Sequence, residues 1–403
     1  MNSNIQGNNE TFNKQIIKII ITKAIKCSEP TLNLVNSFIQ AIYSEDESSL
    51  KKLSAKGLPD DIPMLRSLIW KINLNYLSIN NEDWESTLES QRKTYNNYKE
   101  IFITKLKEEV KLFNDFNTKS PTEKRQIEKN TNKKLLENIA KDVNRTHIQV
   151  SFFCQPVNKN IKLSESEIKE MLEKRRNCIL HDIEDIYKVN INETHADVIA
   201  RMLFIYCKFS PDISYVQGMN ELIAPIYYCY SYGKLNEDED ENEKNIEADT
   251  FWSFYLLMQK LKCLFDREED NSDKGLWGKI YKLKSLVSII DKKLSEHLDN
   301  CKFDFSCFVI RWFTLLFSQE FRLNDILRLW DYLFCDGNLF KNIYYVTLAI
   351  LEMKKNVLLV KNLPGIIEEL QNLLDLEIES IISNAMLLEN HYNSKLSSII
   401  NED

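Results

Sequence analysis

The sequence predicts an all-α protein built as a single large multi-helical domain. Its 403 residues include only 8 glycines and 8 prolines, well below the usual shares of about 7% and about 5%. Apolar residues recur at the helical period, and no segment with the alternation typical of a strand competes with them. Long helices joined by short polar loops are therefore the expected architecture.

The N-terminal part begins with an Asn-rich stretch. We expect residues 1–30 to form a tail that is partly disordered or helical, and residues 31–403 to form the main domain. Apolar spacing predicts a helix in "TLNLVNSFIQAIYS". Because proline suits a first helical turn, a second helix is expected from about Pro63 to Leu77. A third is expected from Tyr95 to Phe113.

Polar stretches divide the helical segments that follow. Residues 114–134 are polar, contain a proline and lack an apolar stripe, which predicts a loop. Residues 155–195 are charged and weakly patterned, which indicates an insertion. Residues 234–247 are acidic and predict a solvated loop, because like charges repel. Helical spacing resumes in "LLENIAKDVNRT" and continues from Thr250 almost to the end of the chain.

The charge and the cysteines limit the class of protein. The net charge of −8, from 52 basic and 60 acidic residues, disfavours nucleic acid as a partner and favours a protein. Nine cysteines without a C-x-x-C pair are typical of a reduced, cytoplasmic protein. Lysines interrupt the early apolar run "IIKIIITKAIKC", which therefore lacks the character of a signal peptide or membrane span.

A search for self-contained chemistry finds no nucleotide or metal motif. The sequence has neither G-x-x-x-x-G-K-[ST] nor G-x-G-x-x-G, so we expect no phosphate-binding loop. The five histidines are far apart and show no ligand spacing for zinc. A Cys-His nucleophile stays open, although the cysteines lie among apolar residues, where a core thiol is the commoner state.

Three short motifs remain, in "IPMLRSLIW", "IAKDVNRT" and "SYVQGMNE". Their candidate residues are Arg66 with Trp70, Asp142 with Arg145, and Tyr215 with Gln217. Each has a simple structural explanation: a packing pair, a surface ion pair on one helix face, and a residue that satisfies backbone donors at a helix start. The apolar run that follows Gln217 predicts a buried helix that fixes this side chain at its exposed start.

Taken together, the motifs resemble the TBC domain of Rab GTPase-activating proteins. The resemblance runs from about Leu53, through "GLPDDIPMLRSLIWKINLNYL", to Phe334 in "RWFTLLFSQEFRLNDILRLWDYLF". It is strongest for the branch with "EADTF" and a long insertion between the second and third motifs. It implies an all-helical domain that accelerates GTP hydrolysis by a GTP-bound Rab protein.

The resemblance also implies roles for individual residues. Arg145 lies at the arginine-finger position and Gln217 at the glutamine-finger position. The remaining motif residues would support the site or bind the partner: Arg66, Trp70, Asp142, Tyr215, Gly218 and Asn220. Gly218 would let the partner's backbone come close. GTP and Mg²⁺ would be bound by the GTPase, so no cofactor or metal of the chain's own is expected.

The sequence departs from the family pattern after the second motif. The proline often found there is missing from "THIQVSFF", but both finger residues are present, which favours an active protein. Two other functions stay open: a catalytically inactive Rab-binding or scaffold module, and a helical adaptor unrelated to GTPases. An active protein would regulate vesicle traffic from the cytoplasm, with at most peripheral attachment to endomembranes through the Rab.

Overall fold

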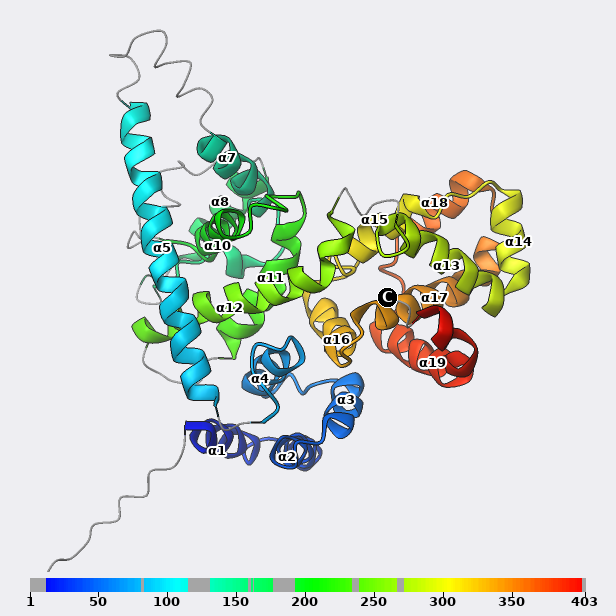
Figure 1. Cartoon of the computed structure of the whole chain (residues 1–403), viewed down its shortest axis with the longest axis horizontal. Helices are drawn as coiled ribbons and strands as arrows, with labels where there is room; N and C mark the ends of the chain where they lie inside the picture. The colour runs from blue at the N-terminus through cyan, green and yellow to red at the C-terminus, as the bar shows by residue number, and fades with distance from the viewer. Residues whose placement is uncertain are drawn as a thin grey trace, which may run out of the picture.

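The computed structural model describes residues 12–80, 83–114, 131–158, 161, 163–176, 193–233, 239–266 and 272–400. Across these residues the chain is helical, and its one β-type contact is an isolated bridge between Pro156 and Thr194. The predicted all-α fold is confirmed (Figure 1).

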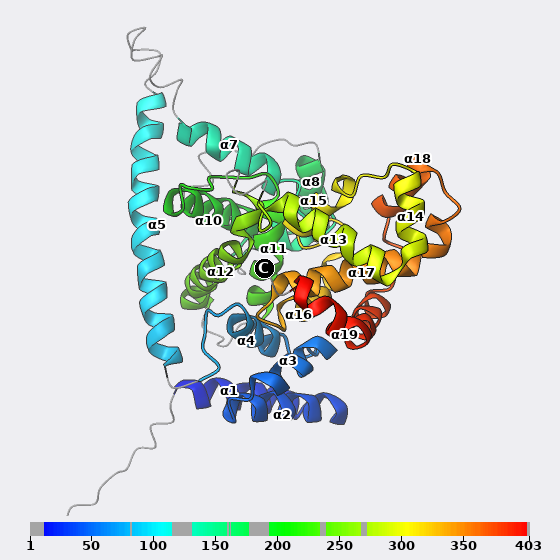
Figure 2. The same cartoon turned by 45° about the vertical axis from the view of Figure 1, so that its right-hand side comes forward.

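The N-terminal helices form the base of the molecule and one of its sides (Figures 1 and 2). They are α1 (Phe12–Ala24), α2 (Glu29–Tyr43), α3 (Glu47–Lys56), α4 (Pro63–Asn73) and the long α5 (Trp84–Asn114). Ser28 caps α2 by accepting the Thr31 N–H, and Asp46 caps α3 by accepting the Ser49 N–H. α1 buries Ile16 and Ile20. The expected tail is therefore partly a packed helix, while residues 1–11 lie outside the described residues.

The middle of the chain supplies the helices that lie beside α5. They are α7 (Thr131–Val143), the 3₁₀ turn η2 (Ser151–Cys154), α8 (Glu165–Arg176), α10 (His195–Phe209), α11 (Met219–Tyr232), α12 (Glu239–Leu261) and the 3₁₀ turn η3 (Lys262–Leu264). A complete capping box starts α10, because Thr194 and Asp197 each bond the other's backbone N–H.

The C-terminal helices form the side opposite α5 (Figures 1 and 2). They are α13 (Leu276–Ile290), α14 (Lys292–Asn300), α15 (Ser306–Thr314), α16 (Leu323–Phe334), α17 (Leu339–Leu358), α18 (Leu363–Gln371) and α19 (Ile378–Ile400). α16 packs against α3, α4 and α11 as well as α17 and α19, so it joins the two sides. The helical spacing from Thr250 onward is confirmed.

Several predicted boundaries are wrong. α4 ends at Asn73 rather than Leu77, because the chain turns at Asn75, whose φ is 66°. α5 starts at Trp84, well before the predicted Tyr95, and extends to Asn114. Of the predicted polar loop, residues 115–130 lie outside the described residues, and residues 131–134 belong to α7.

The predicted acidic loop is wrong over residues 239–247, which open α12; residues 234–238 lie outside the described residues. Glu247 is buried and accepts bonds from Arg201, at 2.7 and 2.9 Å, and from Lys99 and Tyr95, both at 2.6 Å. Burial alone would raise the pKa of Glu247, but Arg201 and Lys99 lower it well below its usual range. A carboxylate that is paired with basic side chains can thus lie inside the core, although the acidic composition of the segment predicted a solvated loop.

A second carboxylate of α12, Asp249, is paired in the same way. Lys71 of α4 donates to it at 2.8 Å, and Arg92 of α5 donates two bonds of 2.8 Å. Burial alone would raise the pKa of Asp249, but Lys71 and Arg92 lower it to about 2. The two carboxylates therefore tie α12 to α4, α5 and α10.

The two ends of the predicted insertion lie against each other. The Val157 N–H donates to the Glu193 carbonyl at 2.8 Å, next to the bridge between Pro156 and Thr194. The Glu193 side chain pairs with Arg201 of α10. The insertion thus leaves and rejoins the domain at one place, held to the buried charges of α12.

Candidate functional site

The carboxylate of Asp142 connects two of the motifs. It lies near the end of α7 and is buried. Its Oδ1 accepts a hydrogen bond from Arg145 Nη2 at 2.8 Å, and its Oδ2 accepts one from the Tyr215 hydroxyl at 2.9 Å. Asp142 thus holds Arg145 with one oxygen and the segment that carries Gln217 with the other.

Arg145 is displayed at the surface by a turn. The sequence interpretation placed it on a helix with Asp142, but α7 ends at Val143 and Arg145 lies in the turn that follows. Its side chain is 51% exposed, and Nε also donates to the Lys141 carbonyl at 3.3 Å. Part of the guanidinium is therefore oriented by the protein while the rest faces solvent.

Asn220 fastens the same turn from the other side. Its amide Nδ2 donates to Thr146 Oγ1 at 2.8 Å and to the Asp142 carbonyl at 3.3 Å. Thr146 is fully buried and donates in turn to the Asp142 carbonyl at 3.2 Å. Because these bonds join the first turn of α11 to the turn that carries Arg145, the second and third motifs form one rigid unit.

Tyr215 serves this unit as a hydrogen-bond donor. Burial and the charge of Asp142 raise the pKa of the Tyr215 hydroxyl well above its usual range. The hydroxyl therefore keeps its proton at neutral pH and can donate it to Asp142. A phenolate here would place two negative charges side by side.

Gln217 lies at the exposed start of α11. The helix buries nearly all of the residues that follow, as the apolar run predicted, whereas Gln217 is exposed. Its side chain has no hydrogen bond within the part of the chain that the structure describes. The amide is thus free to meet another molecule, and its position depends on its backbone.

The conformation and the surroundings of Gly218 both require a glycine. Its φ of 104° lies in the left-handed region, which glycine adopts without strain. A Cβ at this position would lie 2.5 Å from Cδ2 of Leu315. Leu315, from the C-terminal half of the chain, therefore fills the space that a side chain at position 218 would need.

Arg66 and Trp70 do not join the exposed site. Both are buried, and they meet at Asp331 of α16. Arg66 donates to this carboxylate from Nε and Nη2 at 3.1 Å, and Trp70 Nε1 donates at 2.8 Å. Both residues therefore link α4 to α16, and Arg66 Nη1 also donates to the exposed Asp60 at 2.6 Å.

A cavity of about 650 Å³ lies beside the segment that carries Arg145. Gln149 and Val150 line one wall, and Gln319 to Asn324 together with Gln371 to Leu374 line the other. Its rim carries Leu374, which is 66% exposed, and the exposed Arg322.

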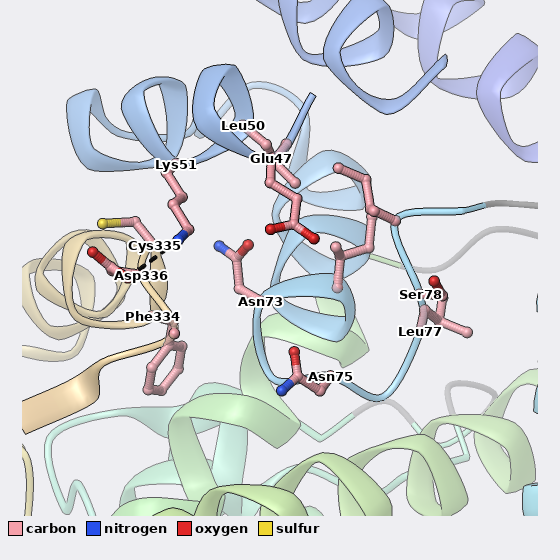
Figure 3. Close-up of a pocket in the computed structure, with 13 residues that line it drawn as sticks. Glu47, Leu50, Lys51, Asn73, Asn75, Leu77, Ser78, Phe334, Cys335 and Asp336 are labelled. Atoms are coloured by element: carbon pink, nitrogen blue, oxygen red, sulfur yellow. Dashed lines mark ion pairs between the residues drawn. The ribbon is translucent and has the colours of Figure 1, made fainter. Parts of the chain in front are cut away.

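A second cavity, of about 410 Å³, lies between α3, the end of α4 and the end of α16 (Figure 3). Lys51 and Asp336 pair across it at 3.3 Å, and Asp336 also pairs with Lys341. None of the predicted site residues lines it. Its mixed and largely paired charges indicate no particular ligand.

One cysteine and one histidine of the described residues lie close together. Cys301 Sγ lies 3.7 Å from His297 Nε2, but the same nitrogen lies 3.1 Å from the Lys361 carbonyl. Since a carbonyl can only accept, Nε2 carries a proton there and cannot act as the base for this thiol. Within the described ranges no group of His, Cys, Asp and Glu could hold a metal ion, and no helix could cross a membrane.

The sequence interpretation missed three residues. Thr146 was inside the quoted motif, directly after Arg145, but received no role. Asp331 is a single carboxylate in the apolar run "RLWDYLF", and an acid in such a run is a usable signal of a buried pair. Nothing in the sequence pattern distinguished Leu315 from other core leucines.

Known proteins resemble this chain in sequence. A model of the Rab-GTPase-TBC domain matches residues 155–359, a range that contains Gln217 and begins after Arg145. TBC1 domain family member 13 of Mus musculus is 32% identical over 349 residues, which cover 77% of this chain and 86% of that protein. The Homo sapiens protein of the same name is 31% identical over 348 residues, with the same coverage.

A solved structure extends the likeness to the fold. The crystal structure of the Ypt/Rab-GAP domain of Gyp1p matches with a TM-score of 0.60 and 21% identity, covering 88% of this chain and 99% of that chain. At this identity the likeness concerns the fold, and it agrees with the all-α architecture. The family model and the relatives confirm the resemblance found in the three motifs. The chain belongs to the Rab-GTPase-TBC domain family.

Proposed function

We propose that this protein accelerates GTP hydrolysis by a GTP-bound Rab-family GTPase, and that it does so by supplying Arg145 and Gln217 to the partner's active site. The observation that carries the proposal is the arrangement around Asp142. This buried carboxylate orients a half-exposed Arg145 and, through Tyr215, holds the segment that presents Gln217. The activity would regulate vesicle traffic from the cytoplasm, with membrane attachment through the Rab.

Arg145 has the chemistry that the transition state needs. Hydrolysis of GTP spreads negative charge over the oxygens of the transferring phosphoryl group, and a planar guanidinium can contact two of these oxygens at once. An arginine supplied in this way accelerates hydrolysis by roughly 10³- to 10⁵-fold. Nη2 of Arg145 donates to Asp142 and Nε donates to the Lys141 carbonyl, so Nη1 can point away from the protein.

Gln217 would orient the attacking water. A neutral amide can donate to a phosphate oxygen and accept a hydrogen bond from water, whereas a carboxylate would repel the phosphate. Because Gln217 lies at the start of a buried helix, its backbone does not have to be ordered when the partner binds. GTP and Mg²⁺ would arrive with the GTPase, and this chain would contribute the two side chains.

The cavity beside Arg145 would extend the contact with the GTPase. Leu374 is the most exposed apolar side chain at its rim. We expect Leu374→Asp to raise KM for the GTPase by about tenfold and to leave kcat nearly unchanged, because this contact would be equal in the ground state and the transition state. A fall in kcat at constant KM would contradict this assignment.

The test is single-turnover phosphate release from a panel of GTP-loaded Rab proteins, with and without the full chain. We expect at least one Rab to respond, and Arg145→Ala and Gln217→Ala each to lower its stimulated rate strongly. Arg328→Ala and Gln40→Ala are matched controls, because Arg328 pairs with Glu379 and Gln40 is exposed on α2.

Two results would decide against the proposal. If no Rab responds, the chain is a silent binding or scaffold module. If a Rab responds equally to the wild type and to Arg145→Ala, the finger assignment is wrong, because the acceleration would then arise elsewhere.

A further inference from the structure

The loop that joins α15 to α16 has a strained backbone in the core. Leu316 and Phe317, two successive residues that are not glycine, have φ values of 50° and 61°. Both are fully buried. Left-handed backbone is unfavourable for such residues and persists where the surroundings hold it. Trp330 Nε1 donates to the Leu316 carbonyl at 2.9 Å, and the Phe317 ring packs on Trp312.

The same loop places the Leu315 side chain against Gly218. Leu315, directly before the strained residues, is only 7% exposed. Its Cδ2 methyl fills the position that a Cβ on Gly218 would occupy. Gly218 is the residue next to Gln217 and the N-cap of α11. The C-terminal half of the chain therefore touches the backbone that carries Gln217.

The contact matters because the Gln217 side chain is positioned through its backbone. The Gln217 amide has no hydrogen bond within the described part of the chain, and Gly218 has no side chain to restrict its own backbone. The Gly218 carbonyl accepts the Glu221 N–H at 2.9 Å and the Val216 carbonyl accepts the Met219 N–H at 3.2 Å, but no side-chain hydrogen bond restrains residues 217 and 218 in the described part of the chain. The Leu315 methyl group packed against Gly218 restricts the φ and ψ angles of Gly218, and these angles determine where Gln217 lies.

We propose that Leu315 is a positioning residue for Gln217, held in place by the strained loop between α15 and α16. The inference rests on the proposed function, since it concerns the glutamine of the same site. Leu315 would touch neither GTP nor water. It would act through the backbone of Gly218 and make the placement of the amide depend on the C-terminal half.

The loss of such a contact should change the rate of the chemical step. A misplacement of about 1 Å in a catalytic group can cost about 10²-fold in rate. We therefore expect Leu315→Ala to lower the stimulated single-turnover rate by roughly tenfold to a hundredfold. The affinity for a GTP-bound Rab should change by less than about threefold, because the water is oriented mainly in the transition state.

The experiment is a double-mutant cycle with the full chain and a responsive Rab. It compares the wild type, Leu315→Ala, Gln217→Ala and the double variant, each with a melting curve. If Leu315 acts through Gln217, Leu315→Ala lowers the rate of the wild type but has no further effect in Gln217→Ala. Leu358→Ala is the matched control, because it removes a fully buried leucine in α17 and should lower Tm without lowering the rate.

Two conservative variants keep the test decisive if Leu315→Ala fails to fold. Leu315→Met retains the volume and should keep a near wild-type rate, whereas Leu315→Val shortens the side chain and should lower the rate by roughly threefold to tenfold. A folded Leu315→Ala or Leu315→Val with full activity, beside an inactive Gln217→Ala, would overturn the positioning role and leave the proposed function standing. Full activity of Gln217→Ala on every responsive Rab would overturn both the glutamine role and this inference.

Discussion

Arg145→Lys separates a catalytic arginine from an ordinary ion pair. The substitution keeps the positive charge and most of the aliphatic stem, but it removes the planar fork of donors. In the structure Arg145 is 51% exposed, with one bond of 2.8 Å to Asp142 and a longer one of 3.3 Å to the Lys141 carbonyl. A lysine at this position can still pair with Asp142.

The expected effects on stability and on activity differ widely. An ion pair with a half-exposed partner contributes little, so the free energy of unfolding should change by at most about 1 kcal/mol. An ammonium lacks the planar, fixed pair of donors that matches two developing oxygens, so the stimulated rate should fall by roughly two to four orders of magnitude. At about 1.4 kcal/mol per factor of ten, this is roughly 3–6 kcal/mol of activation free energy.

The assay is single-turnover hydrolysis of a responsive GTP-loaded Rab, with urea unfolding of each variant. Arg328→Lys is the control, because Arg328 also pairs with a carboxylate, at 2.6 Å, and lies on α16 between α3 and α19. We expect the control to keep the wild-type rate. A folded Arg145→Lys protein with a rate within about threefold of the wild type would refute the reasoning, since a finger arginine is worth roughly 10³-fold or more.

Three further predictions concern the support of the site. Gly218→Ala should lower both stability, by about 1–3 kcal/mol in urea, and the stimulated rate, because it strains a left-handed residue and meets a packed methyl group; an unchanged Cm would contradict the packing described. Asp331→Ala should cost about 3–5 kcal/mol of unfolding free energy, because it leaves the buried guanidinium of Arg66 with the exposed Asp60 as its carboxylate partner; a loss below about 1 kcal/mol would show that Asp60 suffices to neutralise Arg66. Asp249 has a pKa of about 2 in the fold, below its ordinary value, so its stabilisation of about 2 kcal/mol is complete above about pH 4 and is lost as the pH falls toward 2. The stability difference between the wild type and Asp249→Asn should therefore shrink as the pH falls from about 4 to about 2, and a constant difference would argue against the low pKa.

Much of the helical architecture could be predicted from local patterns. Apolar spacing, first-turn prolines and scarce glycine each act within a few residues, and they located most of the helices. The contact between Asp142 and Arg145 was also local, since the two residues are close in sequence. The predicted helix included Arg145, whereas α7 ends at Val143. Periodicity does not show where a turn replaces the last helical residues.

Long-range pairing could not be predicted in the same way. Arg66 and Asp331 lie 265 residues apart, and only the fold brings them together. The charge of residues 239–247 predicted a solvated loop because composition cannot show that Arg201 and Lys99 supply the countercharges for Glu247. The left-handed backbone at Leu316 could not be predicted, because glycine or asparagine is the usual sign of such a conformation and neither is present. The contact between Leu315 and Gly218 could therefore not be predicted either.

The closed base of the insertion bears on how this domain can diverge. The Val157 N–H donates a hydrogen bond of 2.8 Å to the Glu193 carbonyl, and the Glu193 side chain forms an ion pair with Arg201. The chain between these two residues can therefore lengthen or shorten while its ends stay at the same place, and the entropic cost of a longer loop grows only with the logarithm of its length. The number of residues between Arg145 and Gln217 can thus change without moving the two side chains relative to each other. Descendants of one ancestral domain could acquire different insertions here while keeping the same pair of side chains in register.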